Sequence, residues 1–264
     1  MINIIVFIVC FTACIAGAIC GIGGGVLIKP ILDALGILDV ASVSFLSGCT
    51  VLAMTTYSVL RSKMNGKSAI RRKTGFPLAI GAAIGGILGK QMFSIISQVG
   101  PRREFVGIIQ AVCLLMVTFG TLLYTLHKNK VETKDVKSPA MCGVIGCGLG
   151  MCSAFLGIGG GPINLVVLFY FFSMKTKEAA ENSLYVIFYS QLASLITSIV
   201  GRKIPEISIL LLILMIAAGI AGGIVGRSIN KKIPEETVDN LFIGLMVLIM
   251  LVCIWNIIGF WKFS

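Results

Sequence analysis

The sequence predicts an all-α membrane protein of about eight transmembrane segments, arranged as two homologous repeats of four segments. Hydrophobic residues make up 57% of the chain and charged residues only 12%, and the mean hydropathy is +1.00. Apolar runs of spanning length, about 20 residues, follow one another along the chain. The pentapeptide GIGGG occurs twice, each time inside such a run. A soluble domain does not have this composition.

The apolar runs lie at residues 3–28, 41–60, 76–99, 105–126, 141–172, 180–200, 207–229 and 241–261. The first and fifth runs are longer than a straight span requires, and they hold the GIGGG sequences at 21–25 and 157–161. Glycine lowers helix stability by about 1 kcal/mol per residue, so each cluster is expected to break its helix. We therefore predict two short helices meeting at each GIGGG. The N-terminal run lacks a basic start and is expected to be a transmembrane segment, not a signal peptide.

The repeat extends beyond the glycines. GGILGK at 85–90 returns as GGIVGR at 222–227 at an offset of 137, and the two GIGGG sequences are 136 residues apart. We divide the chain into an N-terminal half (1–127), a charged linker (128–138) and a C-terminal half (139–264). Four crossings per half would make the halves parallel, as Arg202 and Lys203 favour, whereas re-entrant broken segments would make them inverted. Both alternatives stay open.

Basic residues are concentrated in short connections between apolar runs, which is typical of membrane proteins and argues against nucleic-acid binding. The largest group lies between residues 61 and 73. The positive-inside rule places this connection in the cytoplasm. Counting segments outward from it places both termini in the cytoplasm as well.

The breaks are expected to bind an anion. A helix begins after each break, and Pro162 occupies the position that proline favours at a helix start. Unpaired amides at a helix N-terminus bind oxyanions; glycines that only allow close helix packing are the alternative. Side chains expected to assist are polar or basic, although a serine often bonds its own helix and a long basic chain often reaches the interface. The candidate ligands are Gly23, Gly24, Gly25, Gly159, Gly160, Gly161, Asn164, Ser44, Ser183, Lys90 and Arg227.

No enzymatic site is predicted. Every aspartate and glutamate, including Asp33, falls at the end of an apolar run or in a connection, and there is no HExxH motif. Cys142, Cys147 and Cys152 lack metal-site spacing, so neither a metal nor another cofactor is expected. Lys29 either attracts anions or faces a loop.

The sequence GIGGGVLIKP at 21–30 resembles the GxGGGxxxxP element of the sulfite exporter TauE/SafE family of membrane transporters. The second copy, GIGGGPINLV, keeps the glycines but has Val166 in place of the proline. The resemblance covers nearly the whole chain. It implies a secondary or facilitative transporter of small anions, such as sulfite, sulfoacetate or related organosulfonates, in a bacterial plasma membrane. A carrier of a neutral metabolite or divalent metal and a non-transporting assembly subunit are the alternatives. The oligomeric state is not predicted.

Overall fold

The computed structural model describes residues 2–64, 71–99 and 103–262, and within these ranges it contains helices and no strands. Eight helices are long and apolar enough to cross a membrane, which confirms the predicted fold class. The shorter helices α2 and α7 complete the two broken segments. The helices are α1 (Ile2–Cys20), α2 (Gly25–Leu35), α3 (Val40–Met64), α4 (Arg72–Val99), α5 (Arg103–His127), η1 (Lys128–Lys130), α6 (Pro139–Leu156), α7 (Pro162–Phe172), α8 (Thr176–Val200), α9 (Ile209–Lys232) and α10 (Glu235–Lys262).

Both predicted breaks are present, and at the first of them the chain turns back on itself. A Cβ built on Gly24 would lie 2.6 Å from Sγ of Cys14, and one built on Gly17 would lie 2.5 Å from the backbone of Gly23. The start of α2 therefore packs beside the last turns of α1. Helix α2 ends at Gly36, whose φ of 61° is a conformation that glycine adopts readily.

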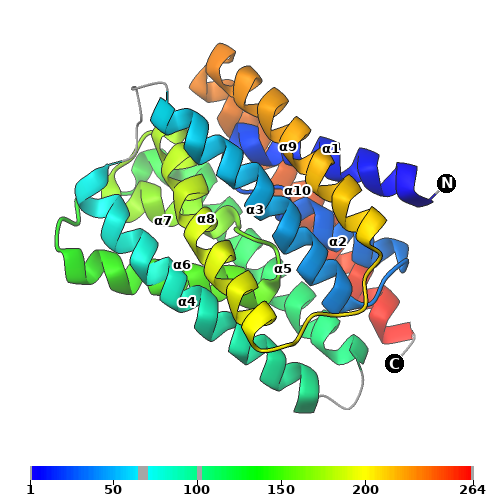
Figure 1. The fold of residues 1–264 in the computed structure, drawn as a ribbon. Helices are drawn as coiled ribbons and strands as arrows, with labels where there is room; N and C mark the ends of the chain where they lie inside the picture. The colour runs from blue at the N-terminus through cyan, green and yellow to red at the C-terminus, as the bar shows by residue number, and fades with distance from the viewer. Residues whose placement is uncertain (1, 65–70, 100–102, 263–264) are drawn as a thin grey trace.

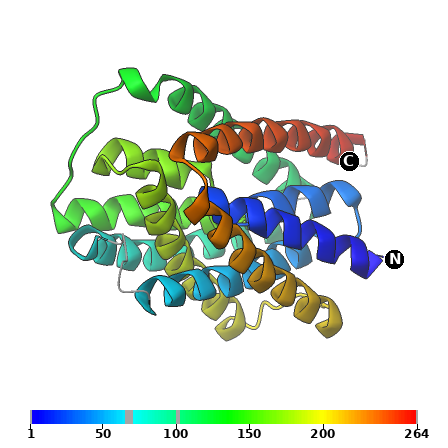
Figure 2. The same ribbon diagram turned by 90° about the horizontal axis from the view of Figure 1, so that it is seen from above.

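The long helices run between two ends of the molecule (Figures 1 and 2). We call the end that holds both chain termini and the connection from α8 to α9 the terminal end. We call the other the basic end; it holds the end of α3 and the starts of α4, α6, α8 and α10. Contacts across the basic end include Arg71 with Glu178 and Lys128 with Asp239.

Helix α1 starts at the terminal end, whereas α6 starts at the basic end (Figures 1 and 2). Each broken segment returns to the end from which it started, and three long helices follow it. This is the inverted arrangement of the two alternatives. The start of α4 lies at the basic end, whereas both termini lie at the terminal end (Figures 1 and 2). The count of segments that placed the termini on the same side as the 61–73 connection therefore does not fit the fold. That count treated each broken segment as a crossing.

The repeated glycine stretches of α4 and α9 allow close packing between helices. A Cβ on Gly85 would overlap the carbonyl oxygen of Cys147 on α6. In the same way, a Cβ on Gly222 would lie 2.6 Å from the carbonyl oxygen of Phe11 on α1. Small residues let membrane helices approach this closely. Thus α4 of the N-terminal half packs on α6 of the C-terminal half, and α9 of the C-terminal half packs on α1 of the N-terminal half. Both contacts join the two halves.

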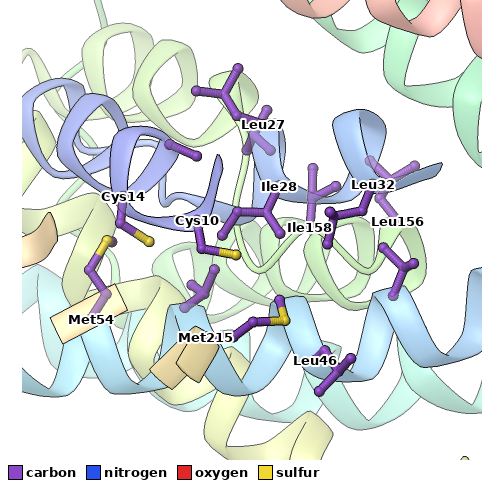
Figure 3. Close-up of a cluster of buried hydrophobic side chains, with 14 of the residues drawn as sticks. Cys10, Cys14, Leu27, Ile28, Leu32, Leu46, Met54, Leu156, Ile158 and Met215 are labelled. Carbon is purple, nitrogen blue, oxygen red and sulfur yellow. The ribbon is translucent and has the colours of Figure 1, made fainter. Parts of the chain in front are cut away.

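The largest apolar cluster among the described residues contains α1 and α2 of the first broken segment and reaches residues 155–158 of the second. Figure 3 shows Ile28 and Leu32 of α2 beside Leu156, which precedes the second break, and Ile158, which lies within it. Met54 of α3 and Met215 of α9 belong to the same cluster, and both are fully buried. This packing holds the unwound backbone inside the protein.

Candidate functional site

The two glycine breaks pack against each other at the centre of the structure. A Cβ built on Gly25 would overlap the carbonyl oxygen of Ile158, and one on Gly160 would lie 2.7 Å from that of Ile22. Gly23 and Gly159 are also close, since a Cβ built on Gly23 would lie 3.3 Å from the carbonyl oxygen of Gly159. Segments that are far apart in the sequence thus form one backbone junction, which we call the glycine crossing (residues 21–25 and 157–161).

Helices α3 and α8 flank the glycine crossing, and each contacts the break of the other repeat. A Cβ on Gly157 would lie 2.6 Å from Oγ of Ser44 on α3, and one on Gly21 would overlap Ala180 on α8. The repeat pairs Ala41 and Ser44 with Ala180 and Ser183, so these contacts are made by matching stretches of the two helices. Both helices therefore determine the shape of the crossing.

The breaks leave buried amides without hydrogen-bond partners. Among the described residues, the backbone N–H groups of Gly23, Gly24 and Gly25 donate no hydrogen bond, nor do those of residues 158–161. These positions are buried. Buried backbone N–H groups without a partner are rare in folded proteins. Because α2 and α7 both begin here, the positive ends of two helix dipoles also lie at the crossing.

Polar side chains near these amides also lack partners in the described part of the chain. Asn164, in the first turn of α7, is 1% exposed, and neither its amide oxygen nor its amide nitrogen has a hydrogen-bond partner. The hydroxyl groups of Ser44, Ser47 and Ser183 are buried and likewise unpartnered. A Cβ on Gly25 would lie 2.8 Å from the Ser47 hydroxyl. The crossing thus combines free donors with adaptable hydroxyl groups.

Lys29 and Asp33 form an ion pair on α2, next to the crossing. Their Nζ and Oδ2 atoms are 2.6 Å apart, and the side chains are 4% and 6% exposed. A Cβ on Gly157 would lie 3.5 Å from Cε of Lys29, so the lysine reaches from the first break to the second. Asp33 is therefore buried, which corrects the expectation that it falls at the edge of an apolar run. Of the two interpretations of Lys29, the loop-facing one is wrong.

Lys90 and Arg227 lie away from each other. Lys90 lines a cavity of about 390 Å³ between α4 and α8, together with Lys203 at the terminal end. Arg227 lines a cavity of about 290 Å³ toward the basic end. Its guanidinium donates to the carbonyl oxygen of Ser58 at 2.6 Å and pairs with Glu181 at 3.4 Å. In the described part of the chain, neither cavity is lined by a residue of the glycine crossing, so the structure places Lys90 and Arg227 in two cavities separate from it.

Ion pairs close the basic end beside the Arg227 cavity. Arg71 donates to both carboxylate oxygens of Glu178, at 2.5 and 3.1 Å, and to the carbonyl oxygen of Phe172. The hydrogen bond to Glu178 raises the pKa of the Arg71 guanidinium above its ordinary value. The arginine therefore stays charged and ties the start of α4 to α7 and α8.

Sequence reasoning missed two further polar residues near the Lys29–Asp33 pair. Gln110 on α5 and Asn256 on α10 are 3% and 4% exposed. Single amides inside long apolar runs give no recognisable motif. The ion pair itself has a recognisable signal, because Lys29 and Asp33 have the i, i+4 spacing of helical pairs. Both residues lie beyond residue 28, where the first predicted apolar run ends, so the pair is not predicted.

The glycine crossing lies within the part of the chain that a protein-family model matches. Residues 6–253 match the model of the family described as sulfite exporter TauE/SafE. The match includes both breaks and confirms the resemblance drawn from their sequences. No curated protein and no solved structure matches the chain. Among the described residues, no group of histidine, cysteine, aspartate and glutamate has the arrangement of a metal site.

Proposed function

The chain belongs to the sulfite exporter TauE/SafE family, and from this premise we propose that it carries small sulfur-containing oxyanions across a membrane by secondary or facilitated transport. Sulfite, sulfoacetate and related organosulfonates are the solutes that the family indicates. The anion binds at the glycine crossing, held by backbone amides from both breaks. No chemical change of the solute is part of this function.

The buried amides without partners are the observation that carries this proposal. Within the part of the chain that the structure describes, the backbone N–H groups of seven residues, Gly23 to Gly25 and residues 158–161, have no hydrogen-bond acceptor. An oxyanion offers several acceptor oxygens at once. Hydrogen bonds to a charged acceptor are roughly twice as strong as neutral ones. Asn164 and Ser44 add donors, and Lys29 supplies the positive charge closest to the second break.

The two charged cavities suggest how the solute reaches the crossing. One cavity, with Lys90 and Lys203, opens toward the terminal end, and the other, with Arg227, opens toward the basic end. The crossing between them is buried in this conformation. We infer that the two halves, which are joined by the α4–α6 and α9–α1 contacts, rock against each other. This motion connects one cavity at a time to the crossing.

We further propose that the basic end faces the cytoplasm of a bacterial cell and that both termini lie outside. The connections at the basic end carry most of the positive charge, including Arg61, Arg71, Lys73, Lys130, Lys134, Lys137, Lys175, Lys177, Lys231 and Lys232. The positive-inside rule then orients the chain. Single cysteines in a cysteine-free variant, at positions 134 and 204, would be labelled from opposite sides by an impermeant maleimide.

Flux into liposomes tests the function. Purified protein would be reconstituted, and uptake of sulfite and sulfoacetate would be compared with uptake of chloride, nickel and cobalt. Saturable uptake of the sulfur anions, competed by one another and not by chloride, is expected. Uptake of a metal alone, or no solute-dependent flux or thermal shift with any of these solutes, would refute the proposal.

A further inference from the structure

A small cavity next to the glycine crossing is lined by polar side chains from three helices. Lys29 and Asp33 of α2, Gln110 of α5 and Asn256 of α10 surround it, with Ile158 of the second break. The cavity has a volume of about 10 Å³, which is the size that one water molecule needs. Asp33 Oδ1, Gln110 Oε1 and Asn256 Oδ1 are all buried, and in the described part of the chain none of them has a hydrogen-bond partner.

The two amide oxygens are fixed as acceptors. The Gln110 nitrogen donates to the carbonyl oxygen of Phe155 at 2.6 Å, and the Asn256 nitrogen donates to that of Pro30 at 2.9 Å. Turning either amide around would place its oxygen against a carbonyl oxygen. The cavity therefore presents three acceptor oxygens. The Lys29 ammonium supplies the donors, and it already donates to Asp33 Oδ2.

This polar cluster has no counterpart in the other repeat. At the offset of 136 that relates the breaks, Lys29 and Asp33 correspond to Leu165 and Phe169. The offset of 137 also relates FVG at 105–107 on α5 to FIG at 242–244 on α10, and at this offset Gln110 corresponds to Val247 and Asn256 to Phe119. Leu165 and Phe169 are buried, so packing does not require charged residues at the positions of Lys29 and Asp33. Val247 and Phe119, by contrast, are 42% and 53% exposed, so the buried amides of Gln110 and Asn256 are specific to their own helices. A function confined to one repeat explains their presence.

We propose that Asp33 takes up one proton each time an anion binds at the crossing, so that transport is coupled to protons. This rests on the proposed function. Lys29 and Asp33 together are neutral, so an added anion would leave its own charge buried without compensation, one negative charge for bisulfite and two for sulfoacetate. An unbalanced buried charge costs several kcal/mol. Protonation of Asp33 removes one negative charge and frees the Lys29 ammonium to face the anion.

The proton comes from the aqueous side that supplies the anion, and it is released with the anion on the other side. It binds Asp33 at Oδ1, the oxygen that Lys29 does not contact, and the resulting O–H is donated to Gln110 or Asn256 directly or through one water. Among the described residues that line the cavity, Cys253 of α10 is the only other titratable group besides Lys29 and Asp33. Cys10 and Cys14 of α1 lie in the apolar cluster that covers α2 (Figure 3).

Proteoliposomes containing a trapped pH dye test the coupling. The anion is sulfoacetate, a dianion that brings no proton near neutral pH, or, if only sulfite is carried, sulfite well above neutral pH, where it too is fully deprotonated. Wild-type protein is expected to move one proton with each anion. Asp33→Asn is expected to keep anion exchange but to lose that proton, with the dye signal falling at least tenfold. It also moves one more negative charge per anion, so an inside-negative potential slows it at least threefold more than wild type. Asp135→Asn, an exposed linker carboxylate, should behave as wild type.

The outcomes separate the two proposals. If wild-type protein carries none of the sulfur anions, the proposed function fails and this inference fails with it. If it carries them and Asp33→Asn moves as many protons as wild type, only the coupling is overturned. Should Asp33→Asn not fold, the wild-type protein decides, because sulfoacetate uptake without any accompanying proton also overturns the coupling.

Discussion

The carbonyl oxygen of Ile158 occupies the space that any side chain at position 25 would need, since a Cβ built on Gly25 would overlap it. The first residue of α2 is thereby locked against the second break. Both the oxygen and the facing glycine are backbone features, so neither can move aside as a flexible side chain would. The geometry of the two breaks is therefore shared, and a change at one must displace the other.

Gly25→Ala is expected to abolish anion flux. The added methyl group must push the two breaks apart, and the amides then no longer converge on one anion. Radiolabelled sulfite uptake into liposomes measures the effect, with Gly120→Ala as the control. A Cβ on Gly120 would meet nothing within 4 Å, and alanine stabilises a helix relative to glycine by about 1 kcal/mol. Normal flux in the Gly25 variant would separate transport from the crossing.

Gly160→Ala is expected to lower stability far more than Gly161→Ala does. Gly160 has a φ of 147°, and a Cβ there would lie 2.5 Å from Cδ1 of Ile187. Gly161 has an extended φ of 176°, and its nearest contact would be at 3.4 Å. Backbone strain and overlap together should cost about 2 kcal/mol or more. Thermal unfolding in detergent measures the difference, and equal melting temperatures would contradict the assigned backbone conformations.

The breaks could be predicted from the sequence because clustered glycines act locally on helix stability. Their mutual packing could not be predicted, because it depends on how α3 and α8 hold Gly157 and Gly21, and no local pattern encodes that contact. The segment count that placed the termini on the same side as the 61–73 connection does not fit the fold for a related reason. A run that holds GIGGG looks like a crossing by length, and only the packing of Gly24 against Cys14 reveals that it turns back.

The polar cluster at Asp33 illustrates a second limit of sequence reasoning. Gln110 and Asn256 are single amides in apolar helices and come together only in the fold. Asn164, by contrast, was predicted as a site residue because it follows the second break within one helical turn. Residues close to a motif in sequence can be found from it, whereas residues that reach it through tertiary packing cannot.

Asn164→Leu is expected to weaken anion binding without destabilising the empty protein. Neither amide atom of Asn164 has a hydrogen-bond partner among the described residues, and replacing an unsatisfied buried polar group by an apolar one is neutral or stabilising. Loss of one hydrogen bond to a charged solute costs about 1.5 kcal/mol, or roughly tenfold in affinity. Sulfite binding and melting temperature should be measured together. A variant that loses stability while its affinity is unchanged would assign Asn164 a structural role.

Lys90→Gln is expected to slow anion entry from the terminal end in a salt-dependent way. Lys90 and Lys203 line one cavity, and their combined positive charge raises the local concentration of an anion. Uptake at low ionic strength should show a KM about threefold higher than wild type, and the difference should vanish in high salt, which screens the lysines. Lys232→Gln, near the basic end, is the matched control. An effect that persists in high salt would place Lys90 in direct contact with the solute.

The Lys29–Asp33 pair is expected to show strong coupling in a double-mutant cycle. Lys29→Met leaves a buried carboxylate without its partner and should cost about 3 kcal/mol of unfolding free energy. Lys29→Met combined with Asp33→Leu removes both charges and should recover most of that loss, as replacement of a buried pair by apolar residues often does. Anion flux should stay absent in the double variant, because no positive charge then faces the crossing. The exposed pair Asp135–Lys137, whose charged atoms are 3.0 Å apart, serves as the reference cycle and should show little coupling. A double variant no more stable than Lys29→Met alone would mean that the pair is not buried as described.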